Sequence, residues 1–163
     1  MKKQTVDALK WIVDILNIHH VQYQLTGGFA AKLYGSSREL HDIDIDIPNA
    51  SMQKILPDVA EFITYGPAHF RDAKWDMELM TLDYNGQEID VGGINTLRIS
   101  NKERTEWISY PNDLSNCLAM RVDGIDVKVQ HPLVLASYKK ELDGDHQLLD
   151  IEAAEKYAAE HDL

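Results

Sequence analysis

The sequence contains a single cysteine, Cys117, and this scarcity excludes an internal disulfide bond. A chain without disulfides suits a reducing compartment. Long apolar runs are absent as well, since no stretch approaches the roughly 20 residues that a membrane-spanning helix requires. The first residues lead directly into an amphipathic pattern, without the apolar region of a signal peptide. We therefore expect a cytoplasmic protein with no membrane-bound part.

Basic residues are scarce relative to acidic ones. The sequence has 16 Lys and Arg against 27 Asp and Glu, and its net charge of −11 corresponds to a pI near 4.9. A protein of this charge has no general positive field to attract a nucleic-acid backbone. The composition therefore weighs against a nucleic acid as partner.

Two familiar kinds of site are also missing from the sequence pattern. No local motif supports Ser-His-Asp or Cys-His catalysis. The cluster of His and Cys ligands that a zinc site needs is absent. The adjacent pair His19-His20 follows a predicted helix, and because neighbouring side chains point apart, we assign it to a turn or to the surface.

The sequence does contain enough apolar material for one hydrophobic core. Hydrophobic residues make up 44% of the 163 positions, which suits a single domain. Mixed strand and helix patterns occupy residues 1–130, and helical patterns follow. We predict a main core over residues 1–130 and a C-terminal helical extension over residues 131–163 that packs on it.

The most informative stretch runs from Asp42 to Ile47. Acidic and apolar residues alternate there, so a β-strand would place Asp42, Asp44 and Asp46 on one face and three isoleucines on the other. Aspartate is a poor strand former, and like charges on one face repel one another. A bound Mg²⁺ would relieve the repulsion, because Mg²⁺ prefers carboxylate oxygens and keeps water ligands that a phosphate can replace. The pattern thus predicts a metal-binding strand.

Two other interpretations of this stretch are less favoured. A calcium-binding EF-hand loop needs Gly at its sixth position and Glu at its twelfth, and counting from Asp42 these positions hold Ile47 and Gln53. An exposed edge strand could carry the charges as protection against aggregation. The nearby glycine pair, described next, favours the metal-binding interpretation over both.

The segment before the acidic strand has a pattern suited to phosphate binding. Residues 23–26 predict a short strand, which ends at Gly27-Gly28 and is followed by a helix over residues 29–34. A strand, a glycine pair and the start of a helix let backbone N–H groups approach a phosphate closely. Arg38 follows and could add a charged phosphate contact.

The spacing of these elements resembles the signature of the DNA polymerase β-like nucleotidyltransferase superfamily. The resemblance is carried by Gly27-Gly28, thirteen intervening residues and then Asp42-Ile43-Asp44-Ile45. Residues 38–46 are most similar to the small lincosamide nucleotidyltransferases, and the aminoglycoside nucleotidyltransferases are similar too. The resemblance implies an α+β fold, with a nucleotidyltransferase-type core sheet, helices on one face and a C-terminal helical tail. Residues 1–130 would then be the catalytic core.

The resemblance also implies a reaction. The two aspartates of the signature, with a third carboxylate, would hold one or two Mg²⁺ or Mn²⁺ ions over a nucleoside triphosphate such as ATP. The nucleoside monophosphate would move to a hydroxyl of a small acceptor molecule, for example an antibiotic. Gly27-Gly28 and Arg38 would hold the β- and γ-phosphates. Lys139 matches a helix lysine that faces the site in related enzymes and is a further nucleotide-binding candidate.

The third carboxylate is expected on a predicted hairpin. Strands over residues 75–84 and 87–91 flank an Asn-Gly pair, which is a strong turn signal. Related enzymes carry this carboxylate on a later strand between apolar residues, so the resemblance implies Asp90 rather than Glu88 on the same face. Asp90 would also take the proton of the acceptor hydroxyl.

The role of Asp46 stays open at this point. It lies one step beyond Asp42 and Asp44 on the same face of the strand and could support the metal ligands. Alternatively, Asp44 and Asp46 could be the working pair, because a shift of two residues preserves the face. The spacing from Gly28 favours Asp42 and Asp44.

The remaining elements are predicted from periodicity. We expect helices over residues 6–17, over residues 52–63 with a kink or a restart at Pro57, over residues 133–142, and from Asp145 onward; a second hairpin over residues 117–129; and a loop or strand over residues 95–111 that lines the acceptor side.

Two other functions remain compatible with the sequence. A relative of these enzymes could bind a nucleotide or a partner without turnover. A toxin-type nucleotidyltransferase could act on a protein or on tRNA, although the acidic charge argues against tRNA. A fold and a metal site do not by themselves identify the acceptor or the preferred base.

Overall fold

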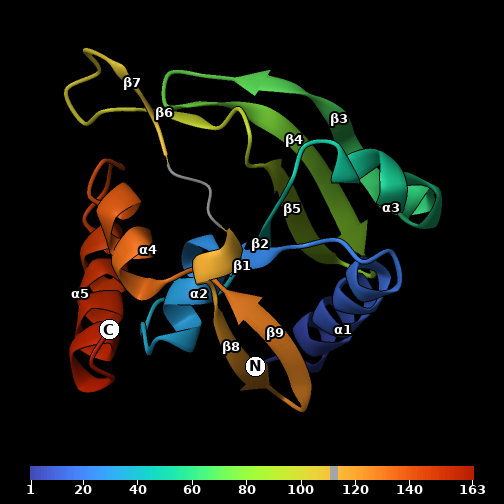
Figure 1. The fold of residues 1–163 in the computed structure, drawn as a ribbon, viewed down its shortest axis with the longest axis horizontal. Helices are drawn as coiled ribbons and strands as arrows, with labels where there is room; N and C mark the ends of the chain where they lie inside the picture. Colours follow the sequence, from blue (N-terminus) through green and yellow to red (C-terminus); the bar gives the residue numbers. More distant parts are fainter. Residues whose placement is uncertain (111–113) are drawn as a thin grey trace.

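A computed structural model describes residues 1–110 and 114–163 of the chain. Within these residues one mixed β-sheet of nine strands runs in the order β7-β6-β4-β5-β2-β1-β9-β8, and β3 pairs with β4 outside this order (Figure 1). The strands are β1 (Gln24–Thr26), β2 (Asp42–Ile47), β3 (Ile63–Arg71), β4 (Trp75–Tyr84), β5 (Gln87–Gly93), β6 (Arg98–Ser100), β7 (Trp107–Ser109), β8 (Leu118–Val122) and β9 (Ile125–Val129). The helices are α1 (Lys3–Ile18), α2 (Gly27–Leu33), α3 (Ser51–Val59), α4 (Pro132–Lys139) and α5 (His146–Glu160), with the 3-10 turns η1 (Ala60–Phe62) and η2 (Leu114–Asn116).

The acidic strand β2 lies in the middle of the sheet. It pairs with β1 in the antiparallel sense and with β5 in the parallel sense. Asp44 is the register partner of Thr26 on one side and of Asp90 on the other. The edge-strand interpretation is therefore wrong, and the strands that carry Thr26, Asp44 and Asp90 are neighbours in the sheet.

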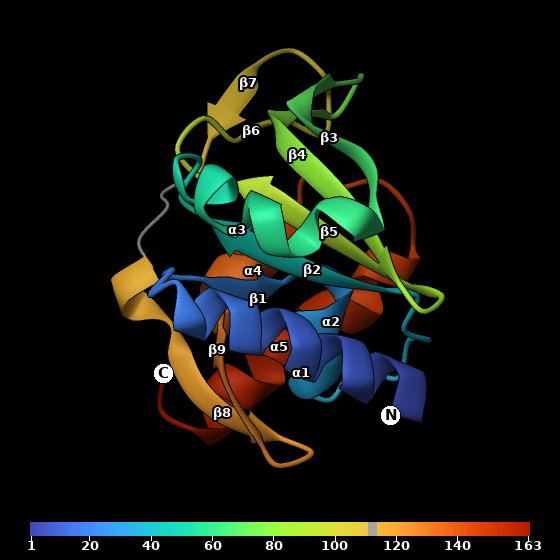
Figure 2. The same cartoon turned by 90° about the vertical axis from the view of Figure 1, so that its right-hand side faces the viewer.

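The alternation in β2 separates an apolar face from a carboxylate face. Ile43, Ile45 and Ile47 are buried in the hydrophobic core, each with at most 1% of its surface exposed. Figure 2 shows α1 and α3 in front of the sheet and α4 and α5 behind it. The carboxylates face the side of α4 and α5, since Asp44 and Lys139 of α4 line one pocket. The predicted α+β fold with a C-terminal helical tail is confirmed, but helices cover both faces of the sheet and not one face as predicted.

The C-terminal helices share the core of the sheet. Leu135 and Ala136 of α4 and Ile151 and Ala154 of α5 belong to the same buried cluster as the strand residues. Along the described part of the chain, no helix combines the length and the apolarity needed to cross a membrane.

The structure differs from the sequence prediction mainly between residues 60 and 71. The third helix ends at Val59 and continues as η1, and β3 follows where no strand was predicted. Gly66-Pro67 interrupts the alternating pattern of β3, and the register with β4 shifts on either side of Tyr65. Proline is tolerated there because β3 pairs along one side only, with β4.

The bounds of the other helices and strands differ less from the predicted ones. The second predicted hairpin is present as β8 and β9, with Cys117 just before it, and the stretch after Asn95 contains the short strands β6 and β7. Helix α4 ends at Lys139, three residues before the predicted end. Pro111, the last residue of the predicted acceptor-side segment, lies outside the described residues.

Candidate active site

The chain bends sharply where β1 passes into α2. Thr26 ends the strand beside Asp44, and Gly27 then has a φ of +60°, in the left-handed region that favours glycine. A Cβ atom on Gly27 would overlap the Asp44 carboxylate, whereas one on Gly28 would meet the end of the Arg38 side chain at 2.5 Å. Glycine at position 27 therefore lets the backbone pack directly on Asp44.

We expect Gly27→Ala to disturb the site far more than Gly28→Ala. Alanine at position 27 needs a left-handed backbone, which costs about 1–2 kcal/mol, and its methyl group would displace the Asp44 carboxylate. Alanine at position 28 requires only a shift of the flexible Arg38 side chain. Thermal unfolding with and without Mg²⁺ measures both effects. Gly27→Ala should lower both the melting temperature and the stabilisation by Mg²⁺, and equal effects of the two variants would contradict this prediction.

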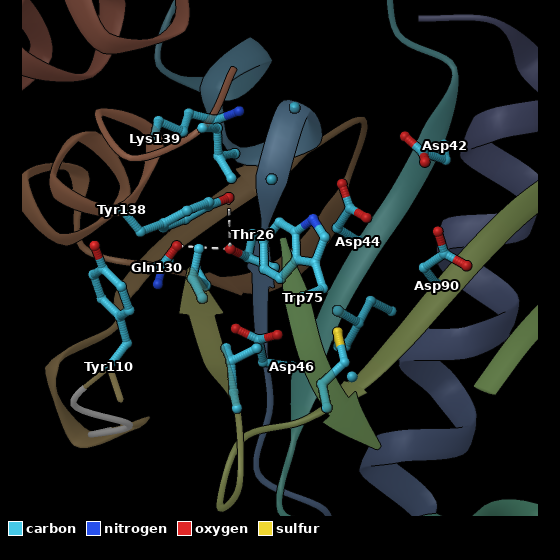
Figure 3. A pocket seen from close by; sticks show the side chains of 18 of the residues that line it. Thr26, Asp42, Asp44, Asp46, Trp75, Asp90, Tyr110, Gln130, Tyr138 and Lys139 are labelled. Carbon is cyan, nitrogen blue, oxygen red and sulfur yellow. Dashed lines mark hydrogen bonds between the residues drawn. The ribbon is translucent and has the colours of Figure 1, made fainter. Parts of the chain in front are cut away.

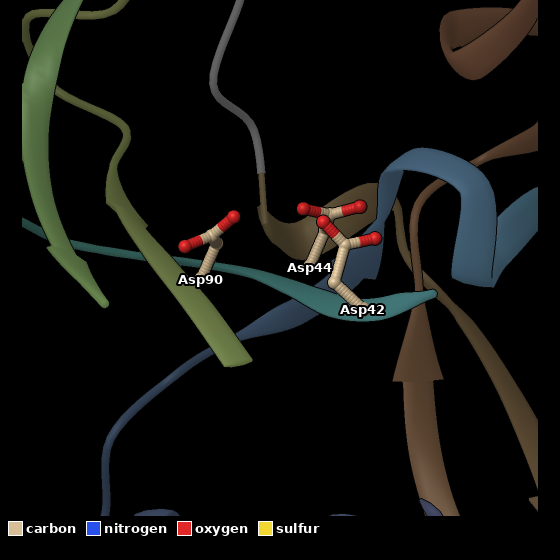
Figure 4. Close-up of side chains that lie close together, drawn as sticks. All are labelled: Asp42, Asp44 and Asp90. Carbon is tan, nitrogen blue, oxygen red and sulfur yellow. The ribbon is translucent and has the colours of Figure 1, made fainter. Parts of the chain in front are cut away.

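Three carboxylates converge at the edge of the pocket next to this bend. One oxygen from each of Asp42, Asp44 and Asp90 lies within 4.8 Å of the others (Figure 4). Two of the carboxylates come from β2 and the third from the adjacent parallel strand β5, where Asp90 is in register with Asp44. Glu88 is in register with Asp42 on the same face, but its side chain is exposed and outside this group.

The electrostatics of the group favour a cation. The pKa of Asp44 is well above its ordinary range, first because burial disfavours its charge and then because other carboxylates, Asp42 foremost, lie nearby. Burial also raises the pKa of Asp90, although a hydrogen bond of 2.7 Å from Thr81 Oγ1 opposes the shift. Carboxylate oxygens are the ligands that Mg²⁺ and Mn²⁺ prefer. The residues present thus fit a divalent ion.

The three carboxylates open into a pocket of about 470 Å³ (Figure 3). Volumes of this size are typical of small-molecule sites. Besides the carboxylates, the lining includes apolar side chains, mainly Trp75, Met77 and Leu79 of β4 and Ile99 of β6. All the site residues predicted from the sequence line it: Gly27, Gly28, Arg38, Asp42, Asp44, Asp90 and Lys139.

A buried aspartate that the sequence prediction missed holds the two predicted phosphate-binding cations. Asp150 of α5 is fully buried and accepts a hydrogen bond of 2.6 Å from Ser36 Oγ. Its Oδ2 lies 2.9 Å from Lys139 Nζ and 3.4 Å from an Arg38 guanidinium nitrogen. Lys139 Nζ also donates to Gln147 Oε1 at 3.1 Å. Lys139 therefore lines the pocket with its charge already paired, and one net positive charge remains on the three residues.

Asp46 lies apart from the metal-binding group. Its side chain is buried and accepts a hydrogen bond of 2.9 Å from Gln24 Nε2. Burial raises its pKa to about 6, and the Gln24 hydrogen bond opposes that shift. The carboxylate cluster found among the described residues contains Asp42 and not Asp46, so the geometry favours Asp42 and Asp44 over the alternative pair.

Sequence reasoning missed the residues that support the site from distant parts of the chain. Thr81 reaches Asp90 across the β4–β5 pair, and Thr26 Oγ1 donates to Gln130 Oε1 at 2.6 Å over 104 positions. Neither contact has a local sequence signal. For Asp150 a signal exists, because this acidic residue occupies a position of the apolar stripe of α5, next to Ile151.

Structures similar to the whole chain are nucleotidyltransferases. A protein from Thermotoga maritima classed as a nucleotidyltransferase matches with a TM-score of 0.71 at 22% identity, covering 99% of this chain and 95% of that one. The lincosamide antibiotic adenylyltransferase LnuA, bound to lincomycin, matches with a TM-score of 0.58 at 16% identity, over 91% and 95% of the chains. ANT(2'')-Ia in complex with adenylyl-2''-tobramycin matches with a TM-score of 0.60 at 13% identity, over 96% and 91%. At these identities the likeness shows the fold.

The family follows from the sequence itself. A comparison with curated proteins found no match. Residues 8–131, which are most of the chain and include the glycine pair and all three clustered aspartates, match the family model described as aminoglycoside-2''-adenylyltransferase. The chain therefore belongs to the aminoglycoside-2''-adenylyltransferase family.

Proposed function

We propose that the protein is a Mg²⁺- or Mn²⁺-dependent enzyme that transfers a nucleoside monophosphate from a nucleoside triphosphate, such as ATP, to a hydroxyl of a small molecule. The observation that supports this most is the convergence of Asp42, Asp44 and Asp90 at a pocket of small-molecule size. In the reaction a bond forms between the acceptor oxygen and the α-phosphorus, the bond from that phosphorus to the bridging oxygen breaks, and pyrophosphate leaves.

The three carboxylates are the proposed metal ligands. When bound there, the divalent ion supplies positive charge for the α-phosphate and the leaving pyrophosphate. Asp42 and Asp44 are held by β2, which is paired on both sides and therefore rigid. Gly27 packs on Asp44 and limits the rotation of its side chain.

Asp90 is the proposed general base. Its Oδ1 receives the hydrogen bond from Thr81, which fixes the carboxylate and leaves Oδ2 to accept the proton of the acceptor hydroxyl. Burial raises the pKa of Asp90, and a carboxylate with a raised pKa is a stronger base than an ordinary aspartate.

The phosphate groups of the nucleotide have donors at the same end of the pocket. The backbone at Gly27 and Gly28 is free of side chains and can come close to phosphate oxygens. Arg38 contributes a guanidinium group that can bind two oxygens at once, and Lys139 lines the same pocket. Asp150 holds both cations in place before the nucleotide arrives.

The acceptor is proposed to be a small hydroxylated molecule of the antibiotic type. LnuA is seen with lincomycin and ANT(2'')-Ia with adenylyl-2''-tobramycin, and both share the fold of this chain. The family of the chain is likewise named for an aminoglycoside-modifying activity.

A screen of hydroxylated acceptors tests this function. The protein is incubated with Mg²⁺, with ATP or GTP, and with one acceptor at a time, and pyrophosphate release and the mass of the acceptor are measured. At least one acceptor should gain the mass of a nucleoside monophosphate, and the Asp42→Asn variant should release pyrophosphate only at background level. Nucleotide binding without turnover for every acceptor would contradict the proposal and favour a binding protein. Modification of a protein or of tRNA would favour the toxin-type function.

A further inference from the structure

Asp46 places a carboxylate against the apolar part of the pocket. It is in register with Gly92 of β5, and a Cβ atom built on Gly92 would lie 3.4 Å from Asp46 Oδ1 and 2.6 Å from Met77 Cε. The Asp46 carboxylate and the Met77 methyl group therefore border the same small space, which the glycine leaves open. In Figure 3 Asp46 lies below Trp75, further along the pocket than Asp44.

This carboxylate has no cationic partner within residues 1–110 and 114–163. Among these residues, the Gln24 side chain donates a hydrogen bond to the Asp46 carboxylate through its amide N–H₂ group. The Cys117 thiol donates to the other side of the same amide, Gln24 Oε1, at 3.3 Å. Arg38 and Lys139 are paired with Asp150, at the other end of the pocket. Asp46 is more than nine-tenths buried, and a buried carboxylate with one neutral donor is costly to keep ionised. A cationic group of a ligand that pairs with it would remove part of this cost.

The pocket around Asp46 combines many apolar and aromatic side chains with the polar side chains of Thr26, Gln130, His146 and Gln147. The pocket has one further carboxylate outside the metal-binding group, Asp72, which is exposed and uses Oδ1 to accept hydrogen bonds from the backbone of Lys74 and Trp75. The apolar and aromatic side chains that line the pocket are Ile45, Phe70, Trp75, Met77, Leu79, Leu97, Ile99, Tyr110, Tyr138 and Leu142.

We infer that Asp46 binds a single ammonium group of an acceptor whose remaining surface is largely apolar. This inference rests on the proposed function and names the class of acceptor: an amphipathic hydroxylated amine. One buried carboxylate can satisfy one ammonium group, and the apolar wall can cover an alkyl or aromatic part of the molecule. A molecule with several ammonium groups would find one buried carboxylate outside the metal-binding group, and each further ammonium group that leaves water without a charged partner costs free energy.

Binding of simple probes tests the inference without turnover. Hexylamine, which is protonated at pH 7, 1-hexanol and spermidine are titrated by calorimetry into the protein saturated with Mg²⁺ and α,β-methylene-ATP, whose α–β bridge cannot be cleaved by transfer. Hexylamine should bind at least about tenfold more tightly than hexanol, because its ammonium group can pair with the Asp46 carboxylate and the hydroxyl of hexanol cannot; tenfold corresponds to about 1.4 kcal/mol. Spermidine, which has more charge and less apolar surface, should bind more weakly than hexylamine.

Two variants locate the effect. Asp46→Asn keeps an acceptor for Gln24 and should remove the advantage of hexylamine over hexanol, whereas Asp72→Asn removes a charge at the pocket rim and should preserve it. Equal binding of hexylamine and hexanol to the wild-type protein, or tighter binding of spermidine than of hexylamine, would overturn the inference even if Asp46→Asn did not fold. Failure of α,β-methylene-ATP to bind would instead count against the proposed function, and the same titrations with Mg²⁺ alone would still compare Asp46→Asn with the wild type.

Discussion

Replacing Asp90 by asparagine is expected to reduce turnover by at least about 100-fold, the usual scale for the loss of a general base. The change removes the proposed proton acceptor and one of the three proposed metal-binding carboxylates. It keeps the size of the side chain and its ability to accept the hydrogen bond from Thr81, so the fold should be preserved. Because the proposed phosphate contacts from Gly27, Gly28 and Arg38 remain, the affinity for the nucleotide should change only a few-fold.

Glu88→Gln is the matched control for this variant. Glu88 and Asp90 lie on the same face of β5, two residues apart, but the Glu88 side chain is exposed and lies outside the carboxylate group. Turnover of both variants is measured under the same conditions with an acceptor from the screen. If Glu88→Gln is the damaging change and Asp90→Asn is nearly silent, the general base has been assigned to the wrong carboxylate.

The central strands of the fold could be predicted because their signals are local. The alternation from Asp42 to Ile47 has the period of a strand, and the Asn-Gly turn marks the hairpin that carries Asp90. The register between β2 and β5 then brings the site residues together. Asp44 and Asp90 are partners on these neighbouring parallel strands, although they are 46 positions apart in the sequence. The resemblance to the nucleotidyltransferases supplied the choice of Asp90, which periodicity alone does not make.

What could not be predicted depends on contacts between distant segments. Strand β3 contains Gly66-Pro67, which breaks the pattern, and its pairing with β4 is visible only in the fold. Lys139 could be named from the sequence, but its ion pair with Asp150 could not, because that contact requires α4 and α5 to pack side by side. The apolar lining of the pocket likewise combines side chains of β3, β4 and β6 with Tyr110 and Leu142.

Without metal the carboxylate group works against folding near neutral pH. A carboxyl group whose pKa is higher in the folded protein than in the unfolded chain favours the folded state at low pH, because the folded protein binds the proton more strongly. It loses this contribution as the pH rises above the unfolded value of about 3.9. Asp44 and Asp90 have raised pKa values, as does Asp46, at about 6. These groups therefore make the metal-free protein less stable as the pH rises from about 4 through 6. A cation bound by Asp42, Asp44 and Asp90 should reverse the part of this loss that comes from Asp44 and Asp90.

Mg²⁺ with α,β-methylene-ATP is accordingly expected to raise the melting temperature strongly at pH 7.5. At a ligand concentration 100 times the Kd, binding to the folded state alone contributes about 2.7 kcal/mol, which corresponds to roughly 5–10 °C for a domain of this size. The stabilisation should shrink as the pH is lowered toward 5, because protonated carboxyl groups do not bind metal. Replacing both Asp42 and Asp44 by asparagine should abolish it, and removal of the like charges should raise the metal-free melting temperature.

The most direct test of the proposed metal site is therefore the melting temperature of the wild type and of the Asp42→Asn, Asp44→Asn double variant, each with and without Mg²⁺ and α,β-methylene-ATP. A large shift for the wild type and none for the double variant is the predicted result. The same shift in both proteins would show that metal and nucleotide bind elsewhere, and no shift in the wild type would show that these carboxylates do not form a metal-dependent nucleotide site.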